Sequence, residues 1–151
     1  DYVLAAEVCR LAKARPGDAV ILYRKAFQSE PTLATRLGSE HRLNAARAAV
    51  QAAAAPDCSA LDRVRYRKWS LAWLKAELAS WKDALQKKQD LLYTVRQTMT
   101  MMLYDPALTS VRSLAYIALL PPAEHENWTA FWREVRELRA DSYPFAEPEP
   151  M

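Results

Sequence analysis

The longest unbroken helical pattern in the chain is LDRVRYRKWSLAWLKAELASWKDALQKK, residues 61–88. Its apolar side chains recur every three or four residues, the spacing of one face of an α-helix. This seam consists of Leu71, Leu74, Leu78, Trp81 and Leu85. Burying one tryptophan removes roughly 150–250 Å² from water, on the order of 4–6 kcal/mol at most. Because the segment also contains Trp69 and Trp73, we expect it to be the spine of the domain, covered on at least one broad face.

The composition of the whole chain indicates an all-α fold. Among 151 residues only two are glycine, and the dominant residues, Ala, Leu, Arg, Lys, Glu and Gln, lose little free energy in a helix. The dipeptides Asn-Gly and Asp-Gly, typical of tight β-hairpin turns, are absent from the sequence. A chain of this length suits one domain or one stretch of a helical solenoid.

Proline and aspartate divide the rest of the chain into further predicted helices. We expect these helices over residues 2–13, 18–29, 40–55, 90–103 and 122–142, with short ones starting at Pro106 and Ser113. Asp18 and Asp105 are the expected N-caps of two of them, because a short acidic side chain accepts a bond from the free N–H groups of a first turn. Residues 143–151 are rich in Pro and Glu and should form a flexible tail.

Charge and cysteine content favour a cytoplasmic protein. The 21 basic and 18 acidic residues give a net charge of +3 and are mixed along the chain. No apolar stretch of about 20 residues is present to cross a membrane. Cys9 and Cys58 lie far apart, so we expect reduced thiols. Because the chain starts at Asp1 inside a helical pattern, we also expect it to be part of a longer protein.

The spacing within residues 19–31 is similar to the second half of a tetratricopeptide repeat, a unit of two antiparallel helices. Ala19, Tyr23, Ala26 and Pro31 stand where that repeat has alanine, an aromatic residue, alanine and proline. In the preceding helix, Val3 and Arg10 stand where the repeat has a large residue and a tyrosine. The similarity therefore covers half of one repeat.

Over residues 19–140, the order of several local patterns resembles the C-terminal region of large bacterial serine/threonine protein kinases that carry tetratricopeptide repeats. The patterns are Leu43-Asn44-Ala45-Ala46, Trp73-Leu74 with Leu78 and Trp81, Asp105-Pro106 with Leu108, Val111 and Arg112, Leu120-Pro121, and Trp128 with Trp132. Leu43, Arg47 and Glu77 depart from the tyrosine, small residue and aspartate common in that family.

The resemblance implies antiparallel hairpins stacked into a short right-handed solenoid that ends in a tryptophan-rich bundle. Residues 1–56 would form degenerate repeat helices, and residues 57–142 a C-terminal capping bundle packed on them as one unit. It also implies a regulatory or protein-interaction scaffold, because the kinase chemistry lies in another domain. His41-Arg42-Leu43 lacks the aspartate of a kinase catalytic loop.

Residues that could support catalysis or bind metal are scattered along the chain. Cys9, His41, Cys58 and His125 are all isolated, whereas zinc ligands usually come in closely spaced pairs. The two glutamates beside His125 lie in a first helical turn, where acidic side chains interact favourably with the helix dipole. We therefore predict a non-enzymatic chain with no metal and no cofactor.

Repeat helices of this type bind peptides along the first helix of each pair. The resulting candidate groove residues are Arg10, Lys13, His41, Asn44, Arg47 and Gln51. Their basic character favours an acidic protein or peptide partner. A face of the first helix would contact upstream repeats. The main alternative is a purely structural solenoid cap, whose polar outer face would be Arg133, Glu134, Arg136, Glu137 and Arg139.

A third alternative is nucleic-acid binding by the basic start of the longest helix. Its candidates are Arg63, Arg65, Arg67 and Lys68, with the aromatic residues Tyr66 and Trp69. Asp62, Glu77 and Asp83 on the same helix favour an ordinary solvated face instead.

Two smaller expectations concern Met99, Met101 and Met102, which suit core filling more than an adaptable groove, and Arg112, which should bond carbonyls that end a neighbouring helix.

Overall fold

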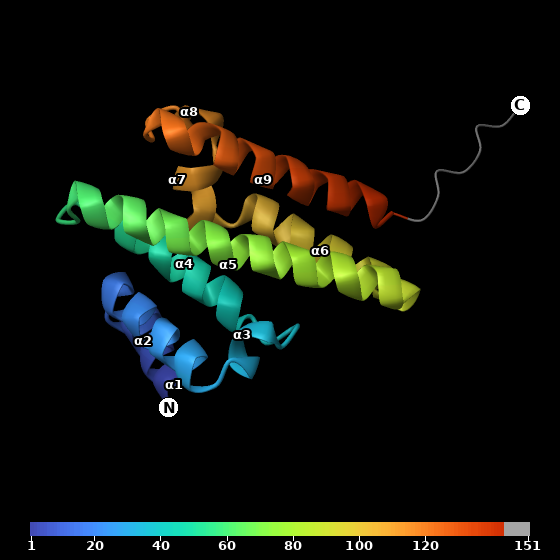
Figure 1. The fold of residues 1–151 in the computed structure, drawn as a ribbon, viewed down its shortest axis with the longest axis horizontal. Helices are drawn as coiled ribbons and strands as arrows, with labels where there is room; N and C mark the ends of the chain where they lie inside the picture. The colour runs from blue at the N-terminus through green and yellow to red at the C-terminus, as the bar shows by residue number, and fades with distance from the viewer. Residues whose placement is uncertain (144–151) are drawn as a thin grey trace, which may run out of the picture. The chain divides into compact units, whose positions relative to one another are not determined.

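The structure is a computed structural model that describes residues 1–143, and over this range every regular element is helical (Figure 1). The chain forms two compact units, Asp1–Ser80 and Trp81–Met151. Their boundary lies inside the longest helix, α5 (Ala60–Lys87), whereas the sequence suggested a division after residue 56. The difference arises because α5 as far as Ser80 bonds the helix before it, as described below. Of the tail predicted at 143–151, all but Tyr143 lies outside the described residues.

The first unit opens with a helical hairpin. Helix α1 (Tyr2–Glu7) is capped by Asp1, whose carboxylate accepts a bond from the Val3 N–H (2.9 Å), and it continues into the π-helical turn η1 (Val8–Ala12). Ala14, at φ 49°, then reverses the chain into α2 (Pro16–Ser29).

The predicted N-cap at Asp18 is wrong. Pro16 occupies the first position of α2, where its fixed φ suits a helix start and its missing N–H is not needed. Asp18 therefore lies inside the first turn, and its carboxylate pairs with the Arg15 guanidinium at 2.6 Å.

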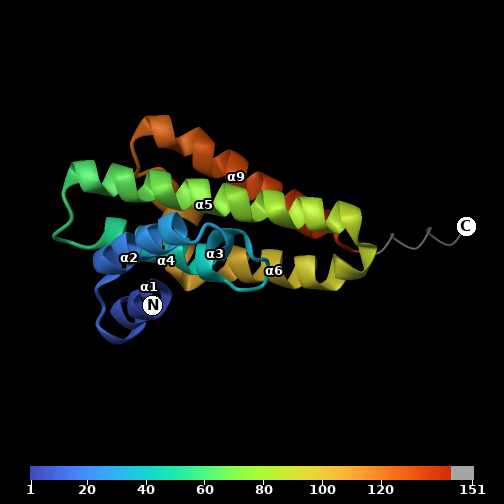
Figure 2. The same cartoon turned by 60° about the horizontal axis from the view of Figure 1, so that its bottom comes forward.

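A short helix, α3 (Thr32–Thr35), precedes the alanine-rich helix α4 (His41–Ala54). Figures 1 and 2 show α2 beside both α1 and α4, in agreement with the contacts among them. The buried core that joins them consists of Ala6, Ala19, Val20, Tyr23, Ala45, Ala48, Ala49 and Ala52. Alanine has no side-chain entropy to lose and allows close approach of two helices. A core made mostly of small side chains can therefore still be closely packed.

Polar contacts join α4 to α5 between Arg63 and Ser80. The Ser70 hydroxyl donates to the Ala46 carbonyl at 3.0 Å. The buried Arg42 guanidinium bonds the Glu77 carboxylate at 2.8 Å and the Ser80 hydroxyl at 2.9 Å. Arg63 donates to the carbonyl of Ala53 in the last turn of α4, where carbonyls lack intrahelical partners, and to that of the C-cap residue Ala55, which also accepts from the Cys58 N–H.

The second unit continues from α5 through η2 (Gln89–Leu91), α6 (Leu92–Tyr104), η3 (Pro106–Leu108), α7 (Thr109–Arg112), α8 (Leu114–Ile117) and α9 (Pro122–Asp141). Its core contains the aromatic side chains Trp128, Phe131 and Trp132, each 1% exposed. The Phe131 and Trp132 rings lie 4.8 Å apart. The Trp132 indole donates to the Val111 carbonyl at 2.8 Å, so its one polar group is satisfied inside the core.

Two predictions for the turn after α6 are confirmed. The Asp105 carboxylate accepts from the Ala107 N–H at 2.9 Å, as an N-cap does. Arg112 donates to the carbonyls of Met102 (3.1 Å) and Asp105 (2.7 Å). Burial lowers the pKa of this guanidinium from its usual value, an effect partly opposed by Asp105. Ser113 precedes α8 as expected but makes no capping bond.

The predicted helices 40–55, 61–88 and 122–142 correspond to α4, α5 and α9, each end within one residue. The π-helical turn η1 and the helix α3 were not predicted, because neither has a distinct periodicity in the sequence. Within residues 1–143, none of the helices combines the length and hydrophobicity that crossing a lipid bilayer requires.

Candidate functional site

Helix α4 is buried on every side but one. Nine of its 14 residues are buried, and the remaining positions recur every three or four residues, so they share one face. His41, Asn44 and Arg47 are half-buried there, and Gln51 is exposed. We call these four residues the α4 stripe. They are four of the six groove candidates expected from the sequence.

Arg10 joins this stripe from the π-helical turn η1. Its guanidinium Nη2 donates to Asn44 Oδ1 at 3.3 Å, and Arg47 Nη1 donates to the same oxygen at 2.7 Å. A single amide oxygen therefore holds two guanidinium groups. The structure brings together three of the residues that the sequence singled out, two of them on α4 and one 34 positions from Asn44.

Two carboxylates that the sequence did not single out complete this cluster. Glu7 Oε2 lies 3.4 Å from Arg10, and Glu40 Oε2 lies 3.8 Å from Arg47. Glu40 has a left-handed backbone at φ 60° just before α4. Arg10 Nε and Glu7 Oε1 are buried without a hydrogen-bond partner among the described residues, so the cluster keeps one donor and one acceptor unused.

The other groove candidates lie around this cluster. His41 lines a cavity of about 430 Å³ together with Asp1, Glu30 and Arg36. Lys13, at the end of η1, and Gln51 are exposed, and within the described chain neither side chain forms a hydrogen bond or ion pair. They are therefore available to solvent or to a partner.

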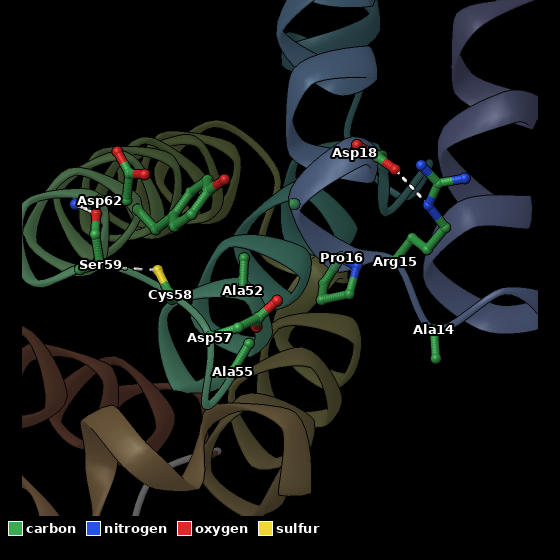
Figure 3. A pocket seen from close by; sticks show the side chains of 12 residues that line it. Ala14, Arg15, Pro16, Asp18, Ala52, Ala55, Asp57, Cys58, Ser59 and Asp62 are labelled. Atoms are coloured by element: carbon green, nitrogen blue, oxygen red, sulfur yellow. Dashed lines mark hydrogen bonds and ion pairs between the residues drawn. The ribbon is translucent and has the colours of Figure 1, made fainter.

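A second cavity, of about 460 Å³, lies where the turn before α2 meets the end of α4 and the start of α5. Asp18, Asp57, Asp62 and Cys58 line it, and Figure 3 shows Arg15 turned onto Asp18 and the Cys58 sulfur beside Ser59. Burial raises the pKa of the Cys58 thiol.

Tyr66 also lines this second cavity, and burial raises the pKa of its phenol. Thiol and phenol are therefore held in their neutral forms, and no histidine lines the cavity to activate them. No group of three or more His, Cys, Asp or Glu side chains within residues 1–143 is arranged to hold a metal ion.

The basic segment at the start of α5 is divided by the fold. Arg63 is engaged with the end of α4, and Arg67 is buried. Arg65 pairs with Asp62 at 3.4 Å, which leaves Lys68 as the exposed member without an acidic partner in the described structure. Tyr66 Oη lies 3.1 Å from the position a Cβ would take at Gly17. The four cations therefore do not form one continuous phosphate-binding surface.

The remaining candidates from the sequence have structural surroundings. Cys9 packs half-buried against the core of the first unit. His125 Nε2 lies 2.6 Å from the Leu120 carbonyl. Met99 and Met102 are buried, as core filling requires, whereas Met101 is 38% exposed.

No protein family, curated protein or solved structure matches this chain.

Proposed function

We propose that this chain is a non-catalytic helical scaffold that binds an acidic peptide segment along the α4 stripe. The observation that carries the proposal is the convergence of Arg10, Asn44 and Arg47 on the one face of α4 that is not buried. These residues come from separate helices, so the face exists only in the folded protein.

The chemistry of the cluster suits a carboxylate ligand. Guanidinium groups bind carboxylates through charge-assisted hydrogen bonds, which are about twice as strong as neutral ones. Arg10 and Arg47 are held in place by Asn44, so little side-chain entropy remains to be lost on binding. Glu7 and Glu40 neutralise the pair in the free protein, and a ligand carboxylate would compete with them. Lys13 adds an exposed positive charge nearby in sequence.

The packing of the first unit supports a repeat-like arrangement. Ala19, Tyr23 and Ala26, the residues that carry the tetratricopeptide resemblance, are all buried. The hairpin formed by α1 and α2 is followed by α4 and α5, which pack on the same core. We propose that these two hairpins are the last units of a right-handed solenoid and that the tryptophan-rich second unit ends it.

The outer face of the first helix supports contact with a preceding hairpin. Leu4, Val8 and Leu11 recur at helical spacing and are 64%, 41% and 68% exposed. The only charged residues of Tyr2–Ala12 are Glu7 and Arg10, which pair with one another. A helix that is apolar on nearly every side is normally covered.

We further propose that the longer protein is a cytoplasmic bacterial serine/threonine kinase and that this chain is its regulatory C-terminal region. This part rests on the sequence resemblance. Reading the complete coding frame tests it, because a kinase domain upstream is expected, and a frame without one contradicts it.

Selection of peptides from a random-sequence display library on the folded chain tests the binding function. We expect enrichment of acidic peptides whose affinity falls about 10–100-fold in the double variant Asn44→Ala with Arg47→Ala, the loss expected for charged hydrogen bonds worth 1.5–3 kcal/mol. Fluorescence anisotropy measures the dissociation constants. The control variant is Arg133→Ala with Arg136→Ala, which removes two exposed cations of α9. Equal affinity for wild type and the α4 variant would contradict the proposal.

The alternative function is a purely structural end cap. It is favoured by the bonds within the cluster, since Arg10 and Arg47 both donate to Asn44 and so join η1 to α4. The exposed charged face of α9, with Arg133, Glu134, Arg136 and Glu137, also suits a terminal repeat. Deleting residues 122–151 separates the two functions. A purely structural end cap predicts that the deletion unfolds the chain and that there is no partner to lose. The scaffold predicts that the chain binds peptide and that the deletion abolishes this binding only if the first unit unfolds.

A further inference from the structure

A groove between α2 and α5 is distinct from the α4 stripe and from the second cavity, shown in Figure 3. It is a hollow of about 260 Å³ within the first unit, lined by Arg24, Phe27, Gln28, Trp69, Ala72 and Trp73. We call it the α2–α5 groove. Its volume suits one large side chain.

The floor of the groove is aromatic. Trp69 and Trp73 are half-buried, with part of each ring packed against the core. The Phe27 ring meets Trp73 edge to face, with centroids 5.9 Å apart. Tryptophan and phenylalanine left partly open to solvent have apolar area that only a partner can cover. The floor of the groove therefore offers apolar area that an apolar side chain would cover.

The rim of the groove carries Arg24, its one charged lining residue. The Arg24 guanidinium lies over the Trp69 ring, with its Cζ 3.9 Å from the ring centroid, and it forms no ion pair among the described residues. Lys25 and Lys68 are exposed on the same two helices. The sequence contains no acidic residue between Asp18 and Glu30 on α2, nor between Asp62 and Glu77 on α5.

The acidic residues that flank the groove segment of α5 in sequence are already paired, and no carboxylate lines the groove. Asp62 is bound by Arg65, and Glu77 is buried against Arg42. A partner that brings carboxylates beside the groove therefore meets complementary charge without a competing acidic side chain from the protein.

We propose that the α2–α5 groove binds a short acidic peptide that inserts one aromatic or leucine side chain between Arg24 and Ala72. The anchor covers Trp69 and Trp73, and its flanking carboxylates bind Arg24 and Lys68. Arg24 is already stacked on Trp69, so its N–H donors are oriented before the peptide arrives and less entropy is lost on binding. Tryptophan and arginine are also the residues that most often dominate binding energy at interfaces.

The geometry favours a peptide over nucleic acid. Binding of single strands relies on free aromatic faces on which successive bases stack, together with a track of cations along the backbone. Here the guanidinium of Arg24 covers one face of Trp69. Arg63 and Arg67, which could have extended the track, are engaged or buried within the fold.

The peptide library described above also tests the groove. The selected peptides are measured against each variant and grouped by the variants that weaken their binding. We expect a class of acidic peptides with one aromatic or leucine residue whose affinity falls at least tenfold in Arg24→Ala with Lys68→Ala. The same class should retain full affinity in Asn44→Ala with Arg47→Ala, which alters only the α4 stripe. Affinity should also fall as salt rises, because the rim contacts are exposed.

A blocking variant keeps the test independent of the cations. Ala72 is exposed on a helix, so Ala72→Glu should leave the helical circular dichroism and the unfolding midpoint nearly unchanged while it fills the groove with a carboxylate. We expect this class of peptides to lose binding to it.

Three outcomes would overturn the proposal: no such class is selected, the selected peptides lack acidic residues, or their binding survives Ala72→Glu. Binding of a fluorescent oligothymidylate that depends on Arg24 and Lys68 would likewise replace the peptide by nucleic acid. Because the α4 variant is measured on the same peptides, failure of the groove and failure of the α4 stripe give different patterns.

Discussion

Arg42 is the charged side chain most deeply involved in joining α4 to α5. Its side chain is 8% exposed and that of Glu77 10% exposed, with Nε and Oε2 2.8 Å apart. Such a pair contributes little relative to apolar residues of the same size, but removal of one member leaves an uncompensated buried charge. The sequence led us to expect Glu77 on a solvated face, and this was wrong, because Glu77 is buried. Nothing in the sequence shows that Arg42, 35 positions earlier, is its partner.

We predict that Glu77→Ala lowers the free energy of unfolding by about 3–5 kcal/mol, because Arg42 then stays buried without its counter-charge. Urea denaturation followed by circular dichroism measures the change. The comparison is the double variant Arg42→Leu with Glu77→Leu, which removes both charges and should be destabilised less. A loss below about 1 kcal/mol in Glu77→Ala would show that the pair does not join the two helices.

Cys58 is expected to react slowly. Burial raises the pKa of its thiol, with the nearby aspartates Asp62 and Asp57 acting in the same direction and Arg63 opposing them. A raised pKa means a smaller thiolate fraction at any pH below it, and the thiolate is the reactive form. In a Cys9→Ser variant, alkylation by iodoacetamide at pH 8 should be slower than for a free cysteine peptide and should increase at higher pH than it does for the peptide. A rate at pH 8 equal to that of the peptide would contradict this.

At the scale of an element, the turn between η1 and α2 contains local backbone strain that could not be predicted from the sequence. Ala14 has φ 49°, in the left-handed region where a Cβ crowds the following carbonyl. It stands two residues before Pro16 and is exposed. The strain allows Arg15 N–H to bond the Cys9 carbonyl at 2.8 Å, which ends the π-helical turn.

We predict that Ala14→Gly raises the free energy of unfolding by about 0.5–1 kcal/mol, since relief of the left-handed strain exceeds the added entropy of the unfolded chain. Thermal unfolding monitored by circular dichroism measures the gain. Ala12→Gly is the matched control, because it places glycine in helical backbone two residues earlier and should be destabilising. A loss of stability in Ala14→Gly would mean that the turn is not strained.

At the scale of the whole molecule, the apolar outer face of the first helix should control self-association of the isolated chain. Leu4 and Leu11 are about two-thirds exposed, so they contribute little to the core. We predict that Leu4→Ser with Leu11→Ser lowers the free energy of unfolding by less than about 1 kcal/mol, yet reduces self-association, because it removes an apolar surface.

Static light scattering at increasing protein concentration and urea denaturation measure these two effects. Leu61→Ser, at another exposed leucine on α5, serves as the control and should change association less. Unfolding of the double variant would show instead that the face is packed within the first unit.

The helices themselves follow from the sequence, and the reason is local. Composition and spacing act over three or four residues, so α4, α5 and α9 could be placed to within one residue. The Arg112 contact with the end of α6 was also predictable, because it spans only 10 positions. His41, Asn44, Arg47 and Gln51 share one face of α4 because they lie three or four positions apart on one helix, whereas their choice as groove candidates came from the family resemblance.

Contacts between helices distant in sequence came only from the tertiary structure. Packing of η1 against α4 brings Arg10 to Asn44 across 34 positions, and packing of α2 against α5 places Arg24 on Trp69. The contact of α4 with α5 commits Arg63 to carbonyls at the end of α4, and Arg67 is buried, which divides a basic run that looks continuous in the sequence. Periodicity determines which face of a helix is apolar, but which neighbour covers that face depends on how side-chain volumes fit together, and that fit is a property of the folded chain.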